Sequence, residues 1–288
     1  MSDPQETTRR PYAGRRIAFA TMHGKEAAVS AAARDLLGAE IVVPEGIDTD
    51  RLGTFSGEVA RIGTVEETAR AKARMGMAAA GLDLGLASEG SYGPHPQIPF
   101  LAAGQEVMVL VDDTRGIVLC ETLTDPAPRY DHATLALGED AAPFLSRIGF
   151  PDHAVVVRPN TGGMAFKGLR DAGKVVEAIA RAAGDSRDGR AFVQTDMRAH
   201  MNPTRMALLS RLAQRLFARA ATPCPACSTP GFGRVGLERG LPCAWCAAPT
   251  DLVRAELFGC TLCNWKETRP RGDGLSEADP GTCPACNP

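Results

Sequence analysis

The sequence predicts an α/β protein with a mixed or mainly parallel sheet and flanking helices, followed by a small C-terminal zinc-ribbon domain. Short apolar runs alternate with helix-periodic segments from Arg15 to Thr195, which is typical of strands that alternate with helices. Eight of the nine cysteines lie beyond Thr222, in four Cys-x-x-Cys pairs. The composition, 44% apolar and 23% charged, indicates a globular chain, long enough for one large or two ordinary domains.

Local signals place the elements in order. Thr64 and Glu67 have the spacing of a capping box and start a helix. Asn202 and Pro203 are an N-cap and a first-turn proline and start another. Helices are expected at 24–37, 64–80, 141–148, 173–183 and 203–221, and strands at 15–21, 40–43, 82–87, 106–111, 117–121, 153–157 and 190–195.

This pattern divides the chain into four segments. They are a flexible N-terminus at 1–14, an α/β body at 15–201, a connecting helix at 202–222 and a double zinc-ribbon domain at 223–288. No apolar h-region opens the chain, and no uncharged apolar stretch approaches the ~20 residues that a membrane helix needs. The net charge of −2 provides no general basic field. We therefore expect a cytoplasmic protein with no membrane partner.

The four cysteine pairs have the spacing of zinc knuckles. Two knuckles supply four thiolates, the tetrahedral set that closes a structural zinc site. In a reducing compartment such pairs bind metal far more often than they form disulfides. We expect the first and second pairs to share one zinc ion and the third and fourth pairs to share the other. A second arrangement stays open, in which the second and third pairs share one ion and the first and fourth pairs, at the outside, share the other. The eight predicted ligands of two structural zinc ions are Cys224, Cys227, Cys243, Cys246, Cys260, Cys263, Cys283 and Cys286.

The charge of the tail disfavours nucleic acid as its partner. From Cys224 onward there are six basic and seven acidic residues. Each four-thiolate zinc site adds about two negative charges, so the loaded tail carries roughly −5, which opposes phosphate. Trp245 and Trp265, each beside a knuckle, are expected to pack a small metal core. The ninth cysteine, Cys120, is expected in the hydrophobic core of the body.

Three motifs in the first ninety residues carry a family resemblance. They are Ala-Thr-x-His-Gly-Lys-Glu at 20–26, Glu-Glu-Thr-Ala-Arg-Ala-Lys-Ala at 66–73 and Leu-Gly-Leu-Ala-Ser-Glu-Gly at 84–90. In this order they resemble inosine/xanthosine triphosphate pyrophosphatases and Maf-like proteins, although His23 replaces the usual Asn. The resemblance implies Lys25 as a phosphate ligand, and Glu66 or Glu67 together with Glu89 as Mg²⁺ ligands. Lys25 also follows a strand at a helix start, where backbone amides favour anions.

Further polar residues surround these motifs. Glu58 closes an acidic, hydroxyl-rich loop and is a candidate Mg²⁺ ligand. His95 lies between two prolines and is a candidate acid, base or ligand. A strand ends and the last helix begins in the segment that contains Asp196, Arg198 and Arg205. Asp196 is therefore a further candidate Mg²⁺ ligand, and Arg198 and Arg205 are candidate phosphate ligands. The whole chain also resembles an uncharacterised bacterial family through 85–96, 195–206 and the ending Cys-Pro-Ala-Cys-Asn-Pro.

The leading hypothesis is a Mg²⁺-dependent hydrolase that acts on a nucleotide or related phosphate, similar to a nucleoside triphosphate pyrophosphohydrolase. Glu89, His95 and Glu67 are its catalytic candidates, and Lys25, His23, Arg198 and Arg205 its phosphate ligands. The candidate Mg²⁺ ligands are Glu58, Glu66, Glu89 and Asp196. The alternative is a non-catalytic binding or scaffold protein whose zinc ribbons contact a protein or nucleic-acid partner.

Overall fold

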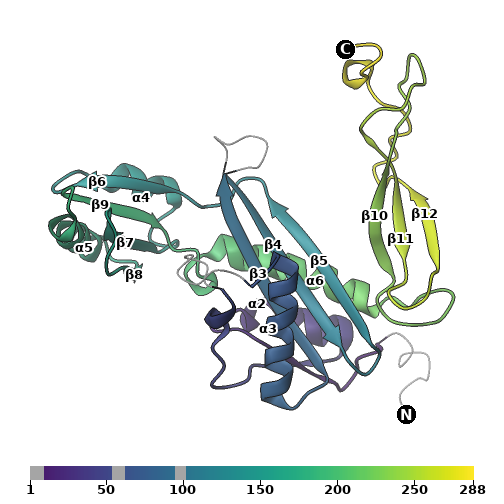
Figure 1. Ribbon diagram of the computed structural model, residues 1–288, viewed down its shortest axis with the longest axis horizontal. Coiled ribbons are helices and arrows are strands. Elements are labelled where there is room, and N and C mark those ends of the chain that lie inside the picture. The colour runs from purple at the N-terminus through teal and green to yellow at the C-terminus, as the bar shows by residue number, and fades with distance from the viewer. Residues whose placement is uncertain (1–9, 54–61, 95–101) are drawn as a thin grey trace.

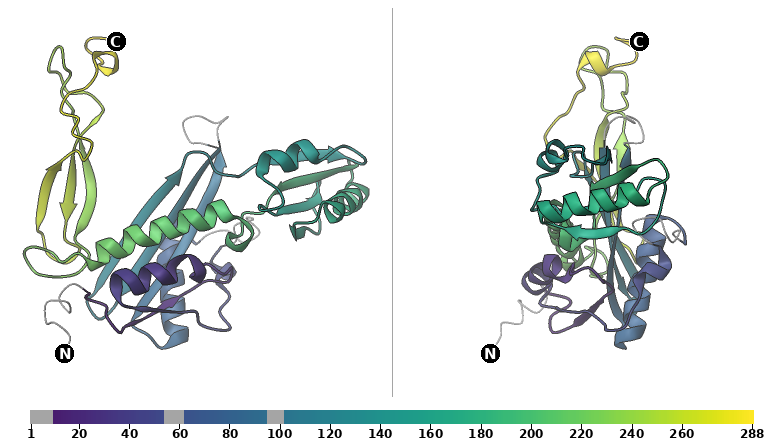
Figure 2. Two further views of the ribbon diagram at one scale, coloured as in Figure 1. Left: turned by 180° about the vertical axis from the view of Figure 1, so that it is seen from behind. Right: turned by 90° about the vertical axis from the view of Figure 1, so that its left-hand side faces the viewer.

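The computed structural model describes residues 10–53, 62–94 and 102–288. The chain forms a central sheet covered by helices, a smaller α/β module and an elongated tail (Figure 1). The module and the tail lie at opposite ends of the long helix α6, Pro203–Ala221 (Figure 2). Within this part of the chain, no helix combines the length and the apolar character needed to cross a lipid bilayer.

The central sheet is mixed. Its strands are β1 Arg16–Phe19, β2 Glu40–Val42, β3 Leu84–Pro94, β4 Ala102–Asp112 and β5 Ile117–Asp125. They lie in the order β2-β1-β3-β4-β5. Strand β1 runs parallel to both of its neighbours, whereas β4 and β5 continue the sheet as antiparallel strands. The predicted α/β class with a mixed sheet and flanking helices is confirmed.

Helices cover both faces of this sheet and bury its apolar side chains. Helix α2, Glu26–Ala32, continues as a π-helical segment, Ala33–Leu37, and lies with α6 on one face. Phe217 of α6, Phe19 of β1 and Leu110 of β4 are almost fully buried in the core between them. Helix α3, Val65–Ala80, covers the opposite face.

Helix α3 starts and packs as its sequence dictates. Thr64 forms the predicted capping box, in which its hydroxyl accepts from the Glu67 N–H at 3.2 Å and the Glu67 carboxylate accepts from the Thr64 N–H at 2.8 Å. Gly85 of β3 admits the helix at close range, because a Cβ there would lie 2.4 Å from Met77 Cγ and 2.9 Å from the Ala73 carbonyl oxygen.

The module between β5 and α6 has its own sheet and its own core. Its elements are β6 His132–Ala136, α4 Ala142–Ile148, β7 Val155–Pro159, β8 Phe166–Leu169, α5 Ala172–Asp185 and β9 Arg190–Thr195. The strands lie in the order β6-β9-β7-β8 and every pair is antiparallel. Phe144, Ile179 and Val193 form part of a separate core against the helices. Residues 15–201, which we expected as one body, thus contain two sheets, because local hydrophobic patterns do not encode which strands pair.

The tail forms a three-stranded antiparallel sheet. Its strands are β10 Gly233–Arg239, β11 Val253–Gly259 and β12 Lys266–Pro270, with β11 in the centre. Arg219 of α6 ties the tail to the central sheet. Its guanidinium donates to the Gly231 carbonyl at 3.1 Å, to the Cys120 carbonyl at 3.1 Å and to the Glu121 carboxylate at 2.8 Å. The base of the tail is therefore fixed to β5 through one side chain of α6.

Candidate functional site

The eight tail cysteines gather into two tetrads, one at each end of the tail sheet. The proximal tetrad is Cys224, Cys227, Cys260 and Cys263, and the distal tetrad is Cys243, Cys246, Cys283 and Cys286. The pairs interleave, first with third and second with fourth, so both pairings considered from the sequence are wrong. The antiparallel strands explain this: each strand carries the chain to the other end of the sheet, so consecutive pairs alternate between ends (Figure 1).

The sulfur positions fit a tetrahedral metal site. In the proximal tetrad the sulfur atoms of Cys227 and Cys260 lie 3.6 Å apart, and those of Cys224 and Cys263 lie 3.7 Å apart. The corresponding distances in the distal tetrad are 3.7 Å and 3.9 Å. Four thiolates at the usual Zn–S bond length of ~2.3 Å form a tetrahedron whose edges are about 3.8 Å. Both tetrads therefore can hold a metal ion.

The knuckle backbones favour the thiolate form of two ligands. Hydrogen bonding to the hydroxyl and the N–H of Thr229 lowers the pKa of the Cys227 thiol to about 6. Backbone N–H groups of Cys246 and Trp245 lower the pKa of Cys243 to about 7. Since the thiolate is the metal ligand, these contacts favour binding at Cys227 and Cys243, whereas the pKa values of Cys263 and Cys286 in the same tetrads are raised.

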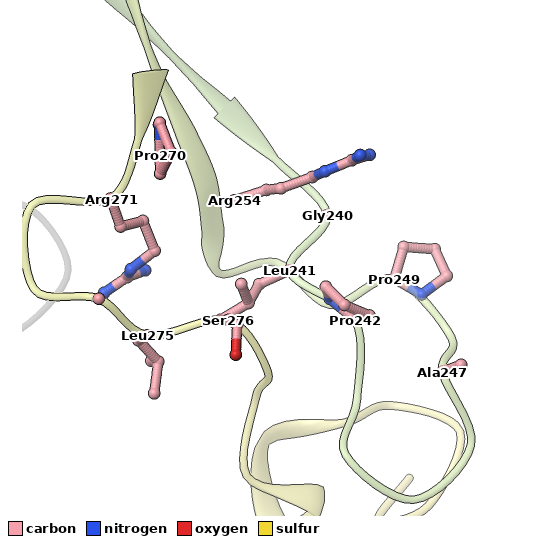
Figure 3. Close-up of a pocket in the computed structure, with 11 residues that line it drawn as sticks. Gly240, Leu241, Pro242, Ala247, Pro249, Arg254, Pro270, Arg271, Leu275 and Ser276 are labelled. Carbon is pink, nitrogen blue, oxygen red and sulfur yellow. The ribbon is translucent and has the colours of Figure 1, made fainter. Parts of the chain in front are cut away.

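The surroundings of the tetrads differ from the expected metal core. Trp245 is 81% exposed and Trp265 is 45% exposed, so the prediction that both pack inside the tail is wrong. A groove of about 600 Å³ lies between the strands and the distal tetrad, lined by Leu241, prolines and two arginines (Figure 3). Of these, Arg271 is paired with Asp273. All residues that line this groove come from the tail itself.

A second, smaller cavity lies at the carboxyl end of β1, beside the middle of β3. The chain leaves β1 for α2 on one face of the sheet, whereas α3, which leads into β3, covers the other face, so the two helical layers diverge beside the end of β1. The cavity holds about 50 Å³, several times the minimum for one water molecule and enough for a phosphate or carboxylate group. Its lining includes Thr21, His23, Lys25, Thr49, Gly53, Lys72, Ser88, Glu89, Gly90 and Arg205. We call it the switch-point pocket.

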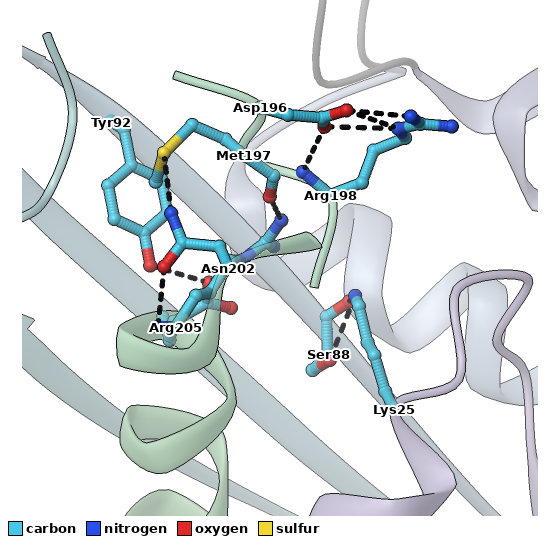
Figure 4. Close-up of polar contacts among 9 residues, drawn as sticks. Lys25, Ser88, Tyr92, Asp196, Met197, Arg198, Asn202 and Arg205 are labelled. Carbon is cyan, nitrogen blue, oxygen red and sulfur yellow. Dashed lines mark hydrogen bonds and ion pairs between the residues drawn. The ribbon is translucent and has the colours of Figure 1, made fainter. Parts of the chain in front are cut away.

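Lys25 is the cation of this pocket without a carboxylate partner among the described residues. Its ammonium donates to the Ser88 carbonyl at 3.2 Å and to the Ser88 hydroxyl at 3.1 Å (Figure 4). Burial lowers the pKa of Lys25 from 10.5 to about 8, and the nearby Arg205 guanidinium adds to this effect. The charged form of Lys25 is thus destabilised by its site.

Two buried ion pairs flank Lys25 on opposite faces of the sheet. On the α3 face, Lys72 pairs with Glu89, and their side chains are 7% and 10% exposed. On the α6 face, Arg205 pairs with Glu106, and their side chains are 4% and 0% exposed. Because Glu89 and Gly90 are consecutive in β3, they face opposite layers, and Gly90 leaves room for the Arg205 pair.

Arg205 also connects three parts of the chain. Its guanidinium donates to the Met197 carbonyl at the end of the module, and Tyr92 donates to the Glu106 carboxylate at 2.8 Å (Figure 4). The backbone N–H of Arg205 donates to the side chain of Asn202 at 3.0 Å, and Asn202 is the predicted N-cap of α6.

The cavity is surrounded by one excess positive charge. This sum counts three cations and two carboxylates: Lys25, Lys72, Arg205, Glu89 and Glu106.

The structure brings together four of the residues predicted for the phosphate site. His23, Lys25, Glu89 and Arg205 all line the switch-point pocket. The ring of His23 also stacks on that of His200, with centroids 5.5 Å apart. The predicted phosphate ligand Arg205, however, already has Glu106 as its partner, and Glu89 has Lys72.

Four other predicted residues do not line this pocket. Glu67 closes the capping box of α3, and Glu66 forms an exposed pair with Arg70. Asp196 is 1% exposed and accepts from the Gly168 N–H at 3.0 Å and from Arg198, so these two residues satisfy each other. Glu58 and His95 lie outside the described residues.

Lys72, Ser88 and Glu106 were missed. Lys72 lies on the same face of its helix as Ala69, Ala73 and Gly76, where a charged residue interrupts an apolar stripe. Glu106 shares the face of Met108 and Leu110 in its strand. A charged side chain on a buried face is the signal that would have found both residues, because such a group requires a partner.

Replacing Lys25 with methionine should raise the free energy of unfolding at pH 7 by about 1–3 kcal/mol. A pKa shift from 10.5 to about 8 corresponds to roughly 3 kcal/mol, reduced because the side chain is partly exposed. Wild-type stability should rise between pH 8 and 10.5, where the unfolded chain retains a proton that the folded chain has released. Urea unfolding of wild type and Lys25→Met at pH 7 and pH 10 measures this difference in stability. Lys174→Met, on the exposed face of α5, is the control. The prediction is contradicted if the gain in stability does not shrink at pH 10 or if Lys174→Met shows the same gain.

The fold and these sites define a mixed α/β protein with a polar pocket at the end of β1 and a C-terminal segment that carries two cysteine tetrads able to hold metal. The chain belongs to the family DUF6671, described as a domain of unknown function, which matches residues 72–288. The matched part contains both tetrads, both buried ion pairs and the whole module. No curated protein and no solved structure matches the chain.

Proposed function

We propose that the protein binds a small phosphate-bearing molecule in the switch-point pocket, with Lys25 as the principal ligand of the anion. One observation carries this proposal: Lys25 is a partly buried ammonium whose hydrogen-bond partner among the described residues is Ser88, beside two pairs whose charges already cancel. A buried excess charge is costly, and a bound anion offsets that cost. The hydroxyl groups of Thr21, Thr49 and Ser88 add hydrogen-bond donors around the same cavity.

The size of the cavity supports recognition of the anionic group. A volume of about 50 Å³ accommodates one phosphate, whereas a nucleoside would extend beyond it, past the stacked rings of His23 and His200. The carboxyl edge of parallel strands is the usual place for such ligands in open α/β sheets. A phosphate ester or a nucleotide is therefore the ligand class we infer.

Hydrolysis of that ligand requires more than the described residues supply. A Mg²⁺-dependent mechanism needs carboxylate oxygens directed at one metal ion. Among the described residues, the groups of three or more metal-binding side chains are the two cysteine tetrads. Glu89 is paired with Lys72, and Glu66 and Asp196 lie outside the pocket. These contacts favour a binding function over the hydrolase, and a turnover assay remains part of the test.

For the tail we propose that both tetrads hold structural Zn²⁺. Four cysteine sulfurs close the coordination sphere and leave no position for water, so the ions stabilise the fold and take no part in chemistry. The distances between the sulfur atoms, 3.6–3.9 Å, support this choice of metal.

Titration calorimetry of the full-length, zinc-loaded protein with pyrophosphate and with ATP tests the pocket, each with and without Mg²⁺. Wild type should bind at least one of these probes, and Lys25→Met should weaken binding at least tenfold. Lys174→Met removes the same charge from the exposed face of α5 and should bind as wild type does. Equal loss in both variants, or no binding to wild type, would refute the proposal. Release of pyrophosphate or phosphate from ATP would support the hydrolase hypothesis instead.

Binding should also depend on pH in a defined direction. Sulfate is a suitable probe because its own charge is constant over the relevant range. Affinity should be full below pH 8 and fall about tenfold per unit as the pH rises above 8, because free Lys25 then loses its proton. An affinity for sulfate that stays constant from pH 7 to pH 10 would show that Lys25 does not bind the anion.

A further inference from the structure

The module presents a sheet face that its own helices do not cover. Side chains alternate along its strands, so Leu135, Val157 and Val193 point to the core with α4 and α5. The opposite positions of β6, β9 and β7 form the outer face. They are His132, Thr134, Ala136, Arg190, Phe192, Gln194, Val156 and Arg158. His132 and Arg190 are exposed, while Phe192 and Arg158 are half-buried.

Three of these side chains stack across the strands. The rings of His132 and Phe192 have centroids 5.3 Å apart and planes inclined by 25°. The Arg158 guanidinium lies 4.4 Å from the centroid of the Phe192 ring, directly across the register from it. The result is a row of three flat groups on β6, β9 and β7, held together by stacking and a cation–π contact.

The outer face is cationic as well as aromatic. Its eight positions contain two arginines, one histidine and no carboxylate. Among the described residues Arg158 has no carboxylate partner, and its guanidinium donates to the Pro159 carbonyl at 3.3 Å. Arg190 lies at the edge of the face, 3.8 Å from Glu139, and is 45% exposed. The charge and the flat groups together fit a ligand that carries both phosphates and aromatic rings.

We propose that this face binds single-stranded nucleic acid, with bases stacked on the His132–Phe192–Arg158 row and phosphates near Arg158 and Arg190. Base stacking on aromatic rings and guanidinium planes is the usual mode of single-strand recognition, and a sheet of this width takes about two or three bases. An acidic peptide would use the charges and leave the stack without a role. The surface is separate from the switch-point pocket and goes beyond the function proposed for it.

Fluorescence anisotropy with a fluorescein-labelled oligouridylate of eight nucleotides tests the proposal on the full-length, zinc-loaded protein. Arg158→Glu should weaken binding at least tenfold and reduce the slope of log affinity against log salt by about 0.7, as expected for one lost contact to a single strand. Arg158→Lys keeps the charge and removes the flat group, so it should weaken binding about threefold. Lys174→Glu makes an equivalent charge reversal on the helical side and should bind as wild type does.

Three outcomes would overturn the proposal. They are no binding of the oligonucleotide by wild type, equal losses in Arg158→Glu and Lys174→Glu, and equal competition by poly-glutamate at the same charge concentration. The last result would assign the surface to acidic peptides. Lys25→Met should leave oligonucleotide binding unchanged, so failure of the pocket and failure of this surface give different results. Circular dichroism verifies that each variant is folded.

Discussion

Replacing Cys224 with serine should lower the bound zinc from two ions per chain to one and unfold the proximal end of the tail. The tail has a small apolar core, to which Phe232, Leu241 and Ala255 contribute, so metal ligation carries much of its stability. Structural zinc contributes about 10–16 kcal/mol to the folding of small zinc domains. The central sheet and the module have separate cores and should remain folded.

Metal analysis and hydrogen exchange measure both parts of this expectation. Amides of β10 and β11 should exchange faster in Cys224→Ser, while those of β3 and β4 keep their protection. Cys120→Ser is the matched control, because Cys120 lies outside both tetrads, and it should retain two ions. A variant that still binds two ions, or a metal-free tail with protected amides, would contradict the structural role.

Replacing Arg205 with methionine should lower the free energy of unfolding by about 3–5 kcal/mol. The change leaves the Glu106 carboxylate, which is 0% exposed, without its cation, and it removes the donor to the Met197 carbonyl. The double variant Arg205→Met with Glu106→Leu should recover most of this loss, because two apolar side chains replace the pair. Urea unfolding of the three proteins gives the values.

The exposed pair between Arg147 and Asp131 provides the control. Their side chains are 56% and 39% exposed, so Arg147→Met should cost less than about 1 kcal/mol. Gly90→Ala disturbs the buried pair by another route, because the new Cβ would lie 2.5 Å from Arg205 Nη2 and 2.6 Å from Glu106 Oε1. If the double variant is as unstable as Arg205→Met alone, the buried charge is not the cause.

Local patterns predicted the elements better than their assembly. The capping box at Thr64, the N-cap Asn202 and the alternation of strands with helices follow from spacing and composition, because these signals act within a few residues. The second sheet was not predicted, since strand pairing depends on contacts between segments far apart in sequence. The interleaved cysteine pairs have the same cause: β10, β11 and β12 decide which knuckles meet.

The candidate site was predicted in part for a similar reason. Lys25 follows the end of β1, and Glu89 follows the end of the strand expected from the sequence at 82–87, where polar residues are noticeable. Glu106 and Lys72 are embedded in apolar segments, and their partners are 99 and 17 residues away in the chain. The pairing of charges within a site therefore depends on the folded chain. In this fold Lys72 and Arg205 are paired with carboxylates, so the excess positive charge lies on Lys25.

The place of α6 in the chain has a consequence for the order in which the protein folds. The five strands of the central sheet are complete at Asp125, yet the face that α6 covers stays open until Pro203–Ala221 have been synthesised. At usual rates of ~5–20 residues per second, the ribosome needs several seconds to add the intervening module. By the end of that interval the last strand of the module is complete at Thr195, so the module can fold before α6 is finished, while Phe19, Leu86 and Leu110 remain accessible to a chaperone.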